Sequence, residues 1–403
     1  MKRTWLESNI WKYFLILFTA RRNFIPILSL YFLTIPNGTA QQIGIYTAAG
    51  YIIGMIFQIP AGYLGDKLWN KTTIIISKVC LVLSSIAFVL WYNFRFFLIW
   101  SMLVSLWWDA FSAGNNSAFL HDTLSLQGKE KTFKKVSSSI RWRVSFLSVF
   151  FIIALPFFTT ISMKFPFEIW LVIDILWLII ATTLFPARAP HHETQNISIK
   201  NIITTIKATK NTWFYSIALF SAIIWAFLMA DGVYRTPYLQ SLWYPIAFIG
   251  LVMWLSRLVR FGVGQYADKI EKIIPLKKLM LIEIVVFVAY YLSTSYISNP
   301  YLVGWIFSLI VWYFRWRSDI YVDHLIRLLP DKQYKSTMLS LKSQISGIIQ
   351  SLLVFGIWFI MTDSYKLWFL LLWVLLFIAL SLAYLFFIKE TKHIDLTSTW
   401  LST

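Results

Sequence analysis

The sequence carries little charge for its 403 residues, because Asp, Glu, Lys and Arg make up only 13% of it while 58% is hydrophobic. A soluble globular domain has about 25% charged residues, so this chain lacks the charge to cover a water-facing surface. The shortage excludes an ordinary soluble enzyme. It also excludes a disordered chain, which stays unfolded because its hydrophobicity is low and its charge high.

Cysteine and phosphate-binding motifs are also scarce. Cys80 is the single cysteine, so no disulfide forms within the chain and a paired-cysteine metal site is excluded. The sequence has no glycine-rich phosphate-binding loop, which argues against an ATP-driven process. His191, His192 and Glu193 are metal-ligating residue types, but a solvated linker explains them better. We therefore expect neither a metal nor a cofactor.

Acidic residues are few beside the basic ones, and the net charge is +18. Such a surplus is typical of proteins that bind nucleic acid. Here, however, the basic residues lie mostly in short clusters between long apolar segments, which is how membrane proteins fix their orientation. We expect a lipid bilayer, and no nucleic acid, as the chain's surroundings.

Long apolar segments dominate the chain, and about 20 residues suffice for a helix to cross a bilayer. The pattern predicts an all-α polytopic membrane protein with 12 transmembrane helices. The predicted spans are residues 12–34, 42–64, 73–92, 96–120, 138–160, 167–186, 212–235, 244–266, 276–296, 301–327, 340–361 and 367–388.

The longest polar stretch separates six spans from six and sets the predicted domains. They are an N-terminal six-helix bundle (1–186), a cytoplasmic linker (187–211), a C-terminal six-helix bundle (212–388) and a cytoplasmic tail (389–403).

Basic residues also predict the orientation of the spans. They concentrate on the side of the N-terminus, Lys71 and Lys78 among them, whereas Arg95, Lys164 and Lys366 fall on the opposite side. The positive-inside rule then places both termini in the cytoplasm. We expect a multi-pass protein of the plasma or inner membrane that acts as a monomer.

An internal repeat relates the two halves. The segment Gly62-Tyr-Leu-Gly-Asp66-Lys67 follows the second span, and Gly264-Gln-Tyr-Ala-Asp268-Lys269 follows the eighth, half a chain length later. At the same offset, His121-Asp122 corresponds to Asp323-His324. Two pseudo-symmetric bundles built by duplication are typical of membrane transporters.

At these loops the chain resembles the major facilitator superfamily (MFS), whose halves carry a G-x-x-x-D-[RK]-x-G-[RK]-[RK] signature. The first copy departs from the signature at Trp69 and Asn70. The resemblance implies a secondary transporter that works by alternating access, not an enzyme. The predicted gating residues are Gly62, Asp66, Lys67, Asp122, Gly264, Asp268, Lys269 and Asp323.

The loop chemistry supports such a gate independently. Glycine lets helices approach closely, and Asp66 can cap a helix or lie at a helix N-terminus, where the macrodipole favours an anion. The alternative is a hydrated turn without a gating role.

Charged residues inside the spans point to the substrate site, because each costs about 2.5–3.5 kcal/mol at a helix centre on insertion scales. Asp231 and Arg235 are four residues apart and can neutralise each other. Arg315, Asp319, Asp323 and Arg327 form a stripe, with Arg317 on a different face; a self-neutralised ladder is the alternative to a binding role. The substrate-binding candidates are Arg21, Arg22, Asp109, Asn116, Asp231, Arg235, Arg315 and Asp319.

Buried acids are candidates for proton coupling, since desolvation raises the pKa of a carboxyl group. Asp109, Asp174 and Glu283 are such acids, although Asp174 and Glu283 fit a buried, hydrogen-bonded role equally well. The fifth span lacks the glycines of the antiporter signature of the superfamily, and Asp109 lies near the position where many proton-coupled members have a basic residue. Proton antiport of the usual type is therefore not expected, while coupling to a proton or another ion stays open.

The substrate class has competing interpretations. Arg21, Arg22 and Arg315 favour a small anionic metabolite, because guanidinium groups match carboxylate and phosphate. The aromatic content of 19% and Asp109 instead favour efflux of amphipathic or cationic drugs. A lipid-handling membrane enzyme would use clustered acids such as Asp122 and Asp323, and a transport-inactive sensor is a further alternative.

Overall fold

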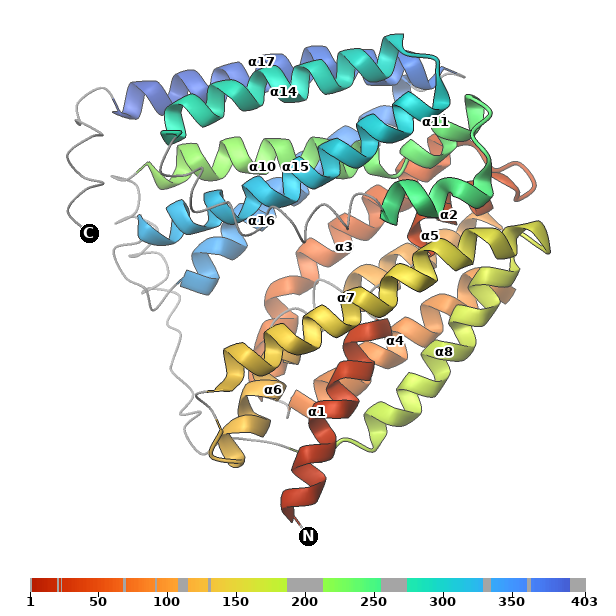
Figure 1. Cartoon of the computed structure of the whole chain (residues 1–403), viewed down its shortest axis with the longest axis vertical. Helices are drawn as coiled ribbons and strands as arrows, with labels where there is room; N and C mark the ends of the chain where they lie inside the picture. The colour runs from red at the N-terminus through yellow and green to blue at the C-terminus, as the bar shows by residue number, and fades with distance from the viewer. Residues whose placement is uncertain are drawn as a thin grey trace. The chain divides into compact units, whose positions relative to one another are not determined.

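The computed structural model describes residues 2–19, 22, 24–67, 70–90, 93–107, 115–129, 132–186, 213–254, 274–328, 335–360 and 364–391. Within these ranges the regular structure is helical and contains no strand (Figure 1). The predicted all-α fold class is confirmed.

The chain divides into two compact units. Unit 1 comprises Met1–Gln195 and Tyr244–Trp254, and unit 2 comprises Asn196–Trp243 and Leu255–Thr403. The segment Tyr244–Trp254 joins unit 1 through its packing on α7. Gly250 allows this packing, since a Cβ there would lie 2.3 Å from the carbonyl oxygen of Ile152.

Unit 1 is built mainly from the N-terminal helices. Within it, α4 packs against α5, α6 and α8, while α1 packs against α6, α7 and α8. The helices are α1 (Lys2–Thr19), α2 (Ile25–Leu33), α3 (Ala40–Lys67), α4 (Asn70–Leu90), α5 (Phe94–Ser105), α6 (Asn115–Leu126), α7 (Phe133–Phe157), η3 (Phe158–Thr160), α8 (Phe165–Thr182) and η4 (Ile246–Phe248).

Aromatic rings fasten α2 to its neighbours in unit 1. Tyr31 stacks on Phe167 of α8 with ring centroids 4.5 Å apart, and Phe32 meets Phe97 of α5 edge-on at 4.9 Å. Phe24, just before α2, packs against Phe167 and is fully buried. Each such pair adds about 0.5–1.5 kcal/mol beyond the burial of its area, so α2 is held by packing despite its nine residues.

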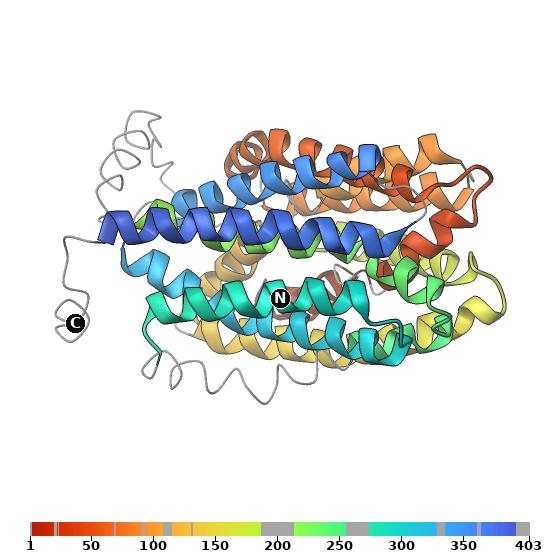
Figure 2. The ribbon, with the colours of Figure 1, turned by 90° about the horizontal axis from the view of Figure 1, so that it is seen from above.

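Unit 2 contains the C-terminal helices. α14 runs along α17 (Figures 1 and 2), and α10 packs against α15, α16 and α17. Its helices are α10 (Phe214–Gly232), α11 (Arg235–Ser241), α14 (Leu276–Tyr296), α15 (Pro300–Arg327), α16 (Lys335–Ile360) and α17 (Tyr365–Thr391).

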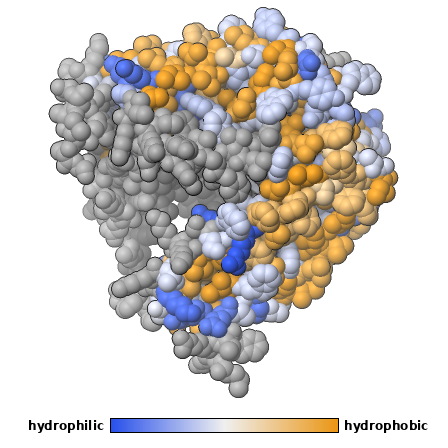
Figure 3. All heavy atoms as spheres, in the orientation of Figure 1, coloured by the Kyte–Doolittle hydropathy of each residue, from blue (hydrophilic) through white to orange (hydrophobic). Residues whose placement is uncertain are grey.

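Apolar side chains cover much of the outer surface of the helices. Figure 3 shows hydrophobic atoms gathered over α8 and over α14 and α17, where Val172, Leu176, Val285 and Leu382 are exposed. Such surfaces are unfavourable in water and suit lipid. Among the described residues, the helices long and apolar enough to cross a membrane are Ser139–Thr160, Phe165–Thr182, Phe214–Gly232, Leu276–Tyr296 and Tyr365–Thr391.

Most observed helices follow the predicted spans closely, but the first span is interrupted. The span predicted at 12–34 is divided between α1, which begins earlier, at Lys2, and α2. The span predicted at 212–235 corresponds to α10, which ends at Gly232, and α11 begins soon after, at Arg235. Residues 108–114 and 255–273, which belong to the fourth and eighth spans, lie outside the described residues. The count of 12 helices and the domain limits therefore stay predictions.

Candidate functional site

The interruption of the first span is centred on Arg22. This residue lies between α1 and α2 with a φ of 35°, in the left-handed region that residues other than glycine rarely adopt. Its amide and carbonyl still bond to Thr19 and Ile25. A backbone held in this region costs about 1–3 kcal/mol and persists only where surrounding contacts fix it. The contacts that fix Arg22 are made by its side chain.

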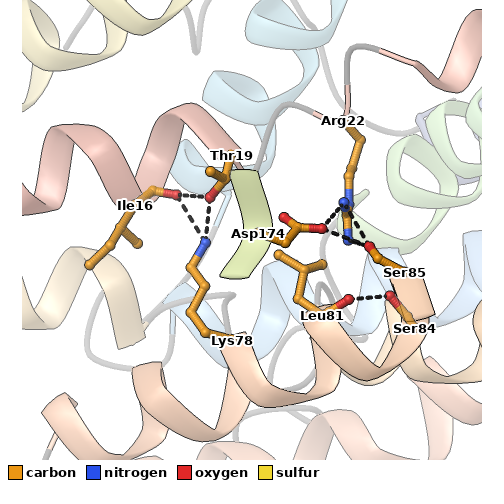
Figure 4. A network of polar contacts seen from close by, with 8 residues as sticks. All are labelled: Ile16, Thr19, Arg22, Lys78, Leu81, Ser84, Ser85 and Asp174. Carbon is orange, nitrogen blue, oxygen red and sulfur yellow. Dashed lines mark hydrogen bonds and ion pairs between the residues drawn. The ribbon is translucent and has the colours of Figure 1, made fainter. Parts of the chain in front are cut away.

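The Arg22 side chain is paired with Asp174 of α8 inside unit 1 (Figure 4). Nη1 of Arg22 donates to Oδ2 of Asp174 at 2.7 Å, and the Ser85 hydroxyl of α4 donates to the same oxygen at 2.7 Å. Arg22 is 3% exposed and Asp174 is fully buried. Within the described part of the chain, Oδ1 of Asp174 and Nε of Arg22 have no hydrogen-bond partner.

A second cation, Lys78 of α4, lies next to this pair and is 1% exposed. Its Nζ donates to the Thr19 hydroxyl at 2.6 Å and to the Ile16 carbonyl at 3.2 Å, both at the end of α1 (Figure 4). Lys78 interacts electrostatically with Asp174 and Arg22. The sequence prediction that Lys78 belongs to a cytoplasmic cluster is wrong, because α4 carries it into the interior of unit 1.

The Arg22 cluster, defined as Arg22, Lys78, Ser85 and Asp174, holds more basic than acidic groups. The ring of Trp107 lies 5.6 Å from Cζ of Arg22 and 5.8 Å from Nζ of Lys78, at cation–π distance. An aromatic face offsets part of the cost of a buried cation. The ring does not neutralise the cation, so among the described residues the cluster carries one more positive than negative charge when both basic groups are protonated.

Unit 2 contains a different cluster at its own helix interruption, the Asp231 cluster of Asp231, Arg235 and Tyr290. Nη2 of Arg235 lies 2.5 Å from Oδ1 of Asp231, and the Tyr290 hydroxyl of α14 donates to Oδ2 at 2.5 Å. Arg235 also donates to the Leu228 carbonyl at 3.3 Å. The ion pair that the four-residue spacing predicts is confirmed, and both carboxylate oxygens are occupied. This cluster is balanced in charge and joins α10 to α11.

A third cluster, the Arg317 cluster, consists of Glu283 of α14 with Arg317 and Tyr321 of α15. Nε of Arg317 lies 2.5 Å from Oε1 of Glu283, and the Tyr321 hydroxyl donates to Oε2 at 2.7 Å. All three residues are fully buried. Of the two interpretations of Asp174 and Glu283, the structure supports buried, hydrogen-bonded acids, since each is paired with an arginine.

Of the other predicted site residues, Asn116 and Asp122 of α6 are buried. Nδ1 of His121 lies 3.9 Å from Oδ1 of Asp122. α3 and α15 are described as helices, but the side chains of Gly62, Asp66, Lys67, Arg315, Asp319 and Asp323 lie outside the described residues. The whole of Arg21, Asp109, Gly264, Asp268 and Lys269 lies outside them too.

The sequence prediction missed the role of Lys78 and the partners of Arg22. A signal for them exists in α4, because Lys78 and Ser85 are seven residues apart and so share one face of a helix. No comparable signal links Arg22 to Asp174, which is 152 residues away. Their pairing follows from the packing of α4 and α8 around the interruption.

Among the described residues, no group of three or more His, Cys, Asp or Glu side chains is placed to hold a metal ion. His191, His192 and Glu193 lie outside the described residues.

Comparison with known proteins identifies the family. The family model of the Major Facilitator Superfamily matches residues 13–316, and a search of curated proteins found no match.

Solved structures share the fold at low sequence identity. The nucleoside transporter NupG superimposes with a TM-score of 0.71 at 13% identity, covering 97% of this chain and 99% of that one. The POT family transporter PepTSo has a TM-score of 0.70 at 11% identity, with coverages of 97% and 98%. A bacterial homologue of the human lysosomal transporter Spinster has a TM-score of 0.64 at 12% identity, with coverages of 99% and 98%. These likenesses concern the fold alone, while the family match covers most of the chain: the protein belongs to the major facilitator superfamily of secondary transporters.

Proposed function

We propose that this secondary transporter carries a small anionic metabolite. The surplus of buried positive charge among the described residues around Arg22 supports the proposal, since Arg22 and Lys78 both interact with the carboxylate of Asp174. A buried cation without a matching anion is costly. A carboxylate or phosphate group of a substrate would offset that cost.

The pairing of three buried acids with arginine supports an anion over a lipophilic cation. A cationic drug is best bound by a buried carboxylate without a basic partner. Asp174, Asp231 and Glu283 are each bonded to an arginine. Binding a cation at any of them would require an arginine to be displaced, whereas an anion would join groups already in place.

The remaining predicted binding residues belong to the same proposal. Within unit 1, Arg22 and Lys78 supply charge, and Arg21, Asp109 and Asn116 are proposed as further binding residues. Within unit 2, Arg315 and Asp319 are proposed as binding residues, and Asp231 and Arg235 are proposed to act indirectly, because they satisfy each other. The fold is consistent with alternating access and with an inner-membrane location, and we place both termini in the cytoplasm on the basis of the positive-inside rule.

The repeated loops are proposed as the gates. Gly62, Asp66 and Lys67 would act in the first half and Gly264, Asp268 and Lys269 in the second, with Asp122 and Asp323 at the corresponding helix positions. Such a latch works through an acid at a helix N-terminus. It affects the rate of conversion between states more than the affinity for substrate.

Uptake by purified protein in sealed vesicles tests the proposal. Succinate and inorganic phosphate serve as anions, glycerol as a neutral solute and tetraphenylphosphonium as a lipophilic cation. We expect saturable uptake of at least one anion, with the solute recovered unmodified, and no saturable uptake of the other two probes. Saturable uptake of the cation alone would establish the drug-efflux alternative, and a chemically altered solute would establish an enzyme.

A further inference from the structure

Among the described residues of unit 2, Arg317 is a completely buried cation, with an exposed fraction of 0%. Its position in the sequence puts it on a different helix face from the stripe of Arg315, Asp319, Asp323 and Arg327. Its Nε, at the side of the guanidinium, bonds to Glu283. Glu283 is itself fully used, since Tyr321 bonds to its other oxygen. The carboxylate therefore fixes Arg317 without reaching the outer edge of the guanidinium.

That outer edge, formed by Nη1 and Nη2, has no hydrogen-bond partner among the described residues. A guanidinium has five N–H donors in a rigid fork; Nε of Arg317 bonds to Glu283, and Tyr321 also interacts with the guanidinium. Buried polar groups in proteins are nearly always satisfied, and an exception calls for an explanation such as a ligand. The two nitrogens are spaced to hold both oxygens of one carboxylate or phosphate group.

Aromatic rings orient the unpaired edge. The ring centroid of Tyr321 lies 4.1 Å from Cζ of Arg317, and that of Phe314 lies 5.8 Å away. Guanidinium groups stack on aromatic faces, so the plane of Arg317 is fixed by these rings and by Glu283. A fork fixed before binding loses little conformational entropy when an oxyanion arrives.

The charge balance also favours an anion. Lys342 of α16 is partly buried and interacts electrostatically with Arg317, and no ion pair of Lys342 is seen within the described residues. With both basic groups protonated, Glu283 leaves one positive charge uncompensated among the residues whose side chains the structure describes. An arriving oxyanion would neutralise it.

We infer that Arg317 and Lys342 form an oxyanion-binding site within unit 2, which takes the carboxylate or phosphate group of a soluble ligand. Arg317 supplies the bidentate fork and Lys342 the second charge. Glu283 and Tyr321 are positioning residues that hold the fork. The site rests on the proposed function in one respect, since we take its ligand to be the transported anion.

Thermal-shift titration of the purified full chain with succinate and with inorganic phosphate tests the site. We expect at least one of them to raise the Tm of the wild type in a saturable manner. Lys342→Met leaves the Arg317–Glu283 pair intact and should raise the dissociation constant about tenfold, the effect of losing one charge-assisted interaction. Lys389→Met, which removes an exposed lysine of α17, is the matched control and should bind like the wild type.

The variant Arg317→Lys tests the contribution of the bidentate guanidinium donors independently of the positive charge. It keeps a cation beside Glu283 but loses the second pair of donors, so we expect a rise in the dissociation constant of about tenfold or more. The Tm without ligand shows whether each variant folds. If Arg317→Lys does not fold, Lys342→Met decides the question.

If Lys342→Met and any folded Arg317→Lys bind succinate and phosphate as tightly as the wild type, the oxyanion site is overturned. It is also overturned if neither succinate nor phosphate raises the Tm of the wild type. Vesicle uptake keeps the two proposals apart. Anion uptake by the wild type combined with unchanged binding in the variants overturns the oxyanion site alone. If the variants bind the anion more weakly but the wild type transports no anion, the oxyanion site is supported and the proposed function is overturned.

Discussion

The Arg22 cluster of unit 1 and the Asp231 cluster of unit 2 both place an arginine–aspartate pair at an interrupted helix, but they differ in charge and in reach. Asp231 and Arg235 are four residues apart, and their charges cancel. Arg22 reaches Asp174 across the unit, and Lys78 adds a second cation. The difference suggests that the Asp231 cluster serves mainly to join α10 to α11, while the Arg22 cluster is prepared for an anion.

Removal of the shared carboxylate should have the largest effect. Asp174→Ala leaves both Arg22 and Lys78 buried without a counter-charge, and breaking a buried pair costs about 3–5 kcal/mol. We expect a large fall in Tm and the loss of anion uptake. A variant with the Tm of the wild type would show that the cluster is not the closely coupled group described above.

Double variants should separate the two clusters. Asp231→Ala alone leaves Arg235 unpaired and should cost about 3 kcal/mol, whereas Asp231→Ala combined with Arg235→Ala removes both charges and should recover most of the Tm. Asp174→Ala combined with Arg22→Ala should recover less, because Lys78 stays buried without an acid. Thermal denaturation measures the Tm of each variant. If the Tm recovers equally in both double variants, the two clusters do not differ in charge balance.

Single hydroxyl groups should have the smallest effects. Ser85→Ala removes one hydrogen bond to Asp174, and Tyr290→Phe removes one to Asp231. Each should lower stability by about 1.5–3 kcal/mol, the range for a hydrogen bond to a charged group. We expect Ser85→Ala to weaken anion uptake and Tyr290→Phe to leave its apparent affinity unchanged. The reverse result, in the same vesicle assay, would assign the ligand to the Asp231 cluster.

The sequence predicted helices well where apolar length alone decides them. The span predicted at 276–296 coincides with α14, and that at 301–327 differs from α15 by one residue. The interruption at Arg22 was not predicted, because a run of apolar residues does not reveal a local φ of 35°. Here packing and ion pairing override the helical pattern.

Charged contacts were predictable when they were local. The Asp231–Arg235 pair follows from its spacing on one helix face, whereas the partners of Arg22 and Arg317 depend on how separate helices pack. Lys78 was assigned to a cluster of loop lysines because its neighbours Lys67 and Lys71 lie nearby in sequence. Burial of a lysine depends on the depth of its helix in the unit, which composition does not give.

The central claim is that the buried positive charge of Lys78 helps to bind the transported anion. Uptake of succinate and phosphate into vesicles that contain the Lys78→Met variant tests this claim. The matched control is Lys164→Met, which removes an exposed lysine paired with Glu168 and should leave uptake unchanged. The account predicts that Lys78→Met lowers anion uptake about tenfold at a substrate concentration below saturation, with protein folded as judged by Tm. Uptake by folded Lys78→Met equal to that of the control would contradict it.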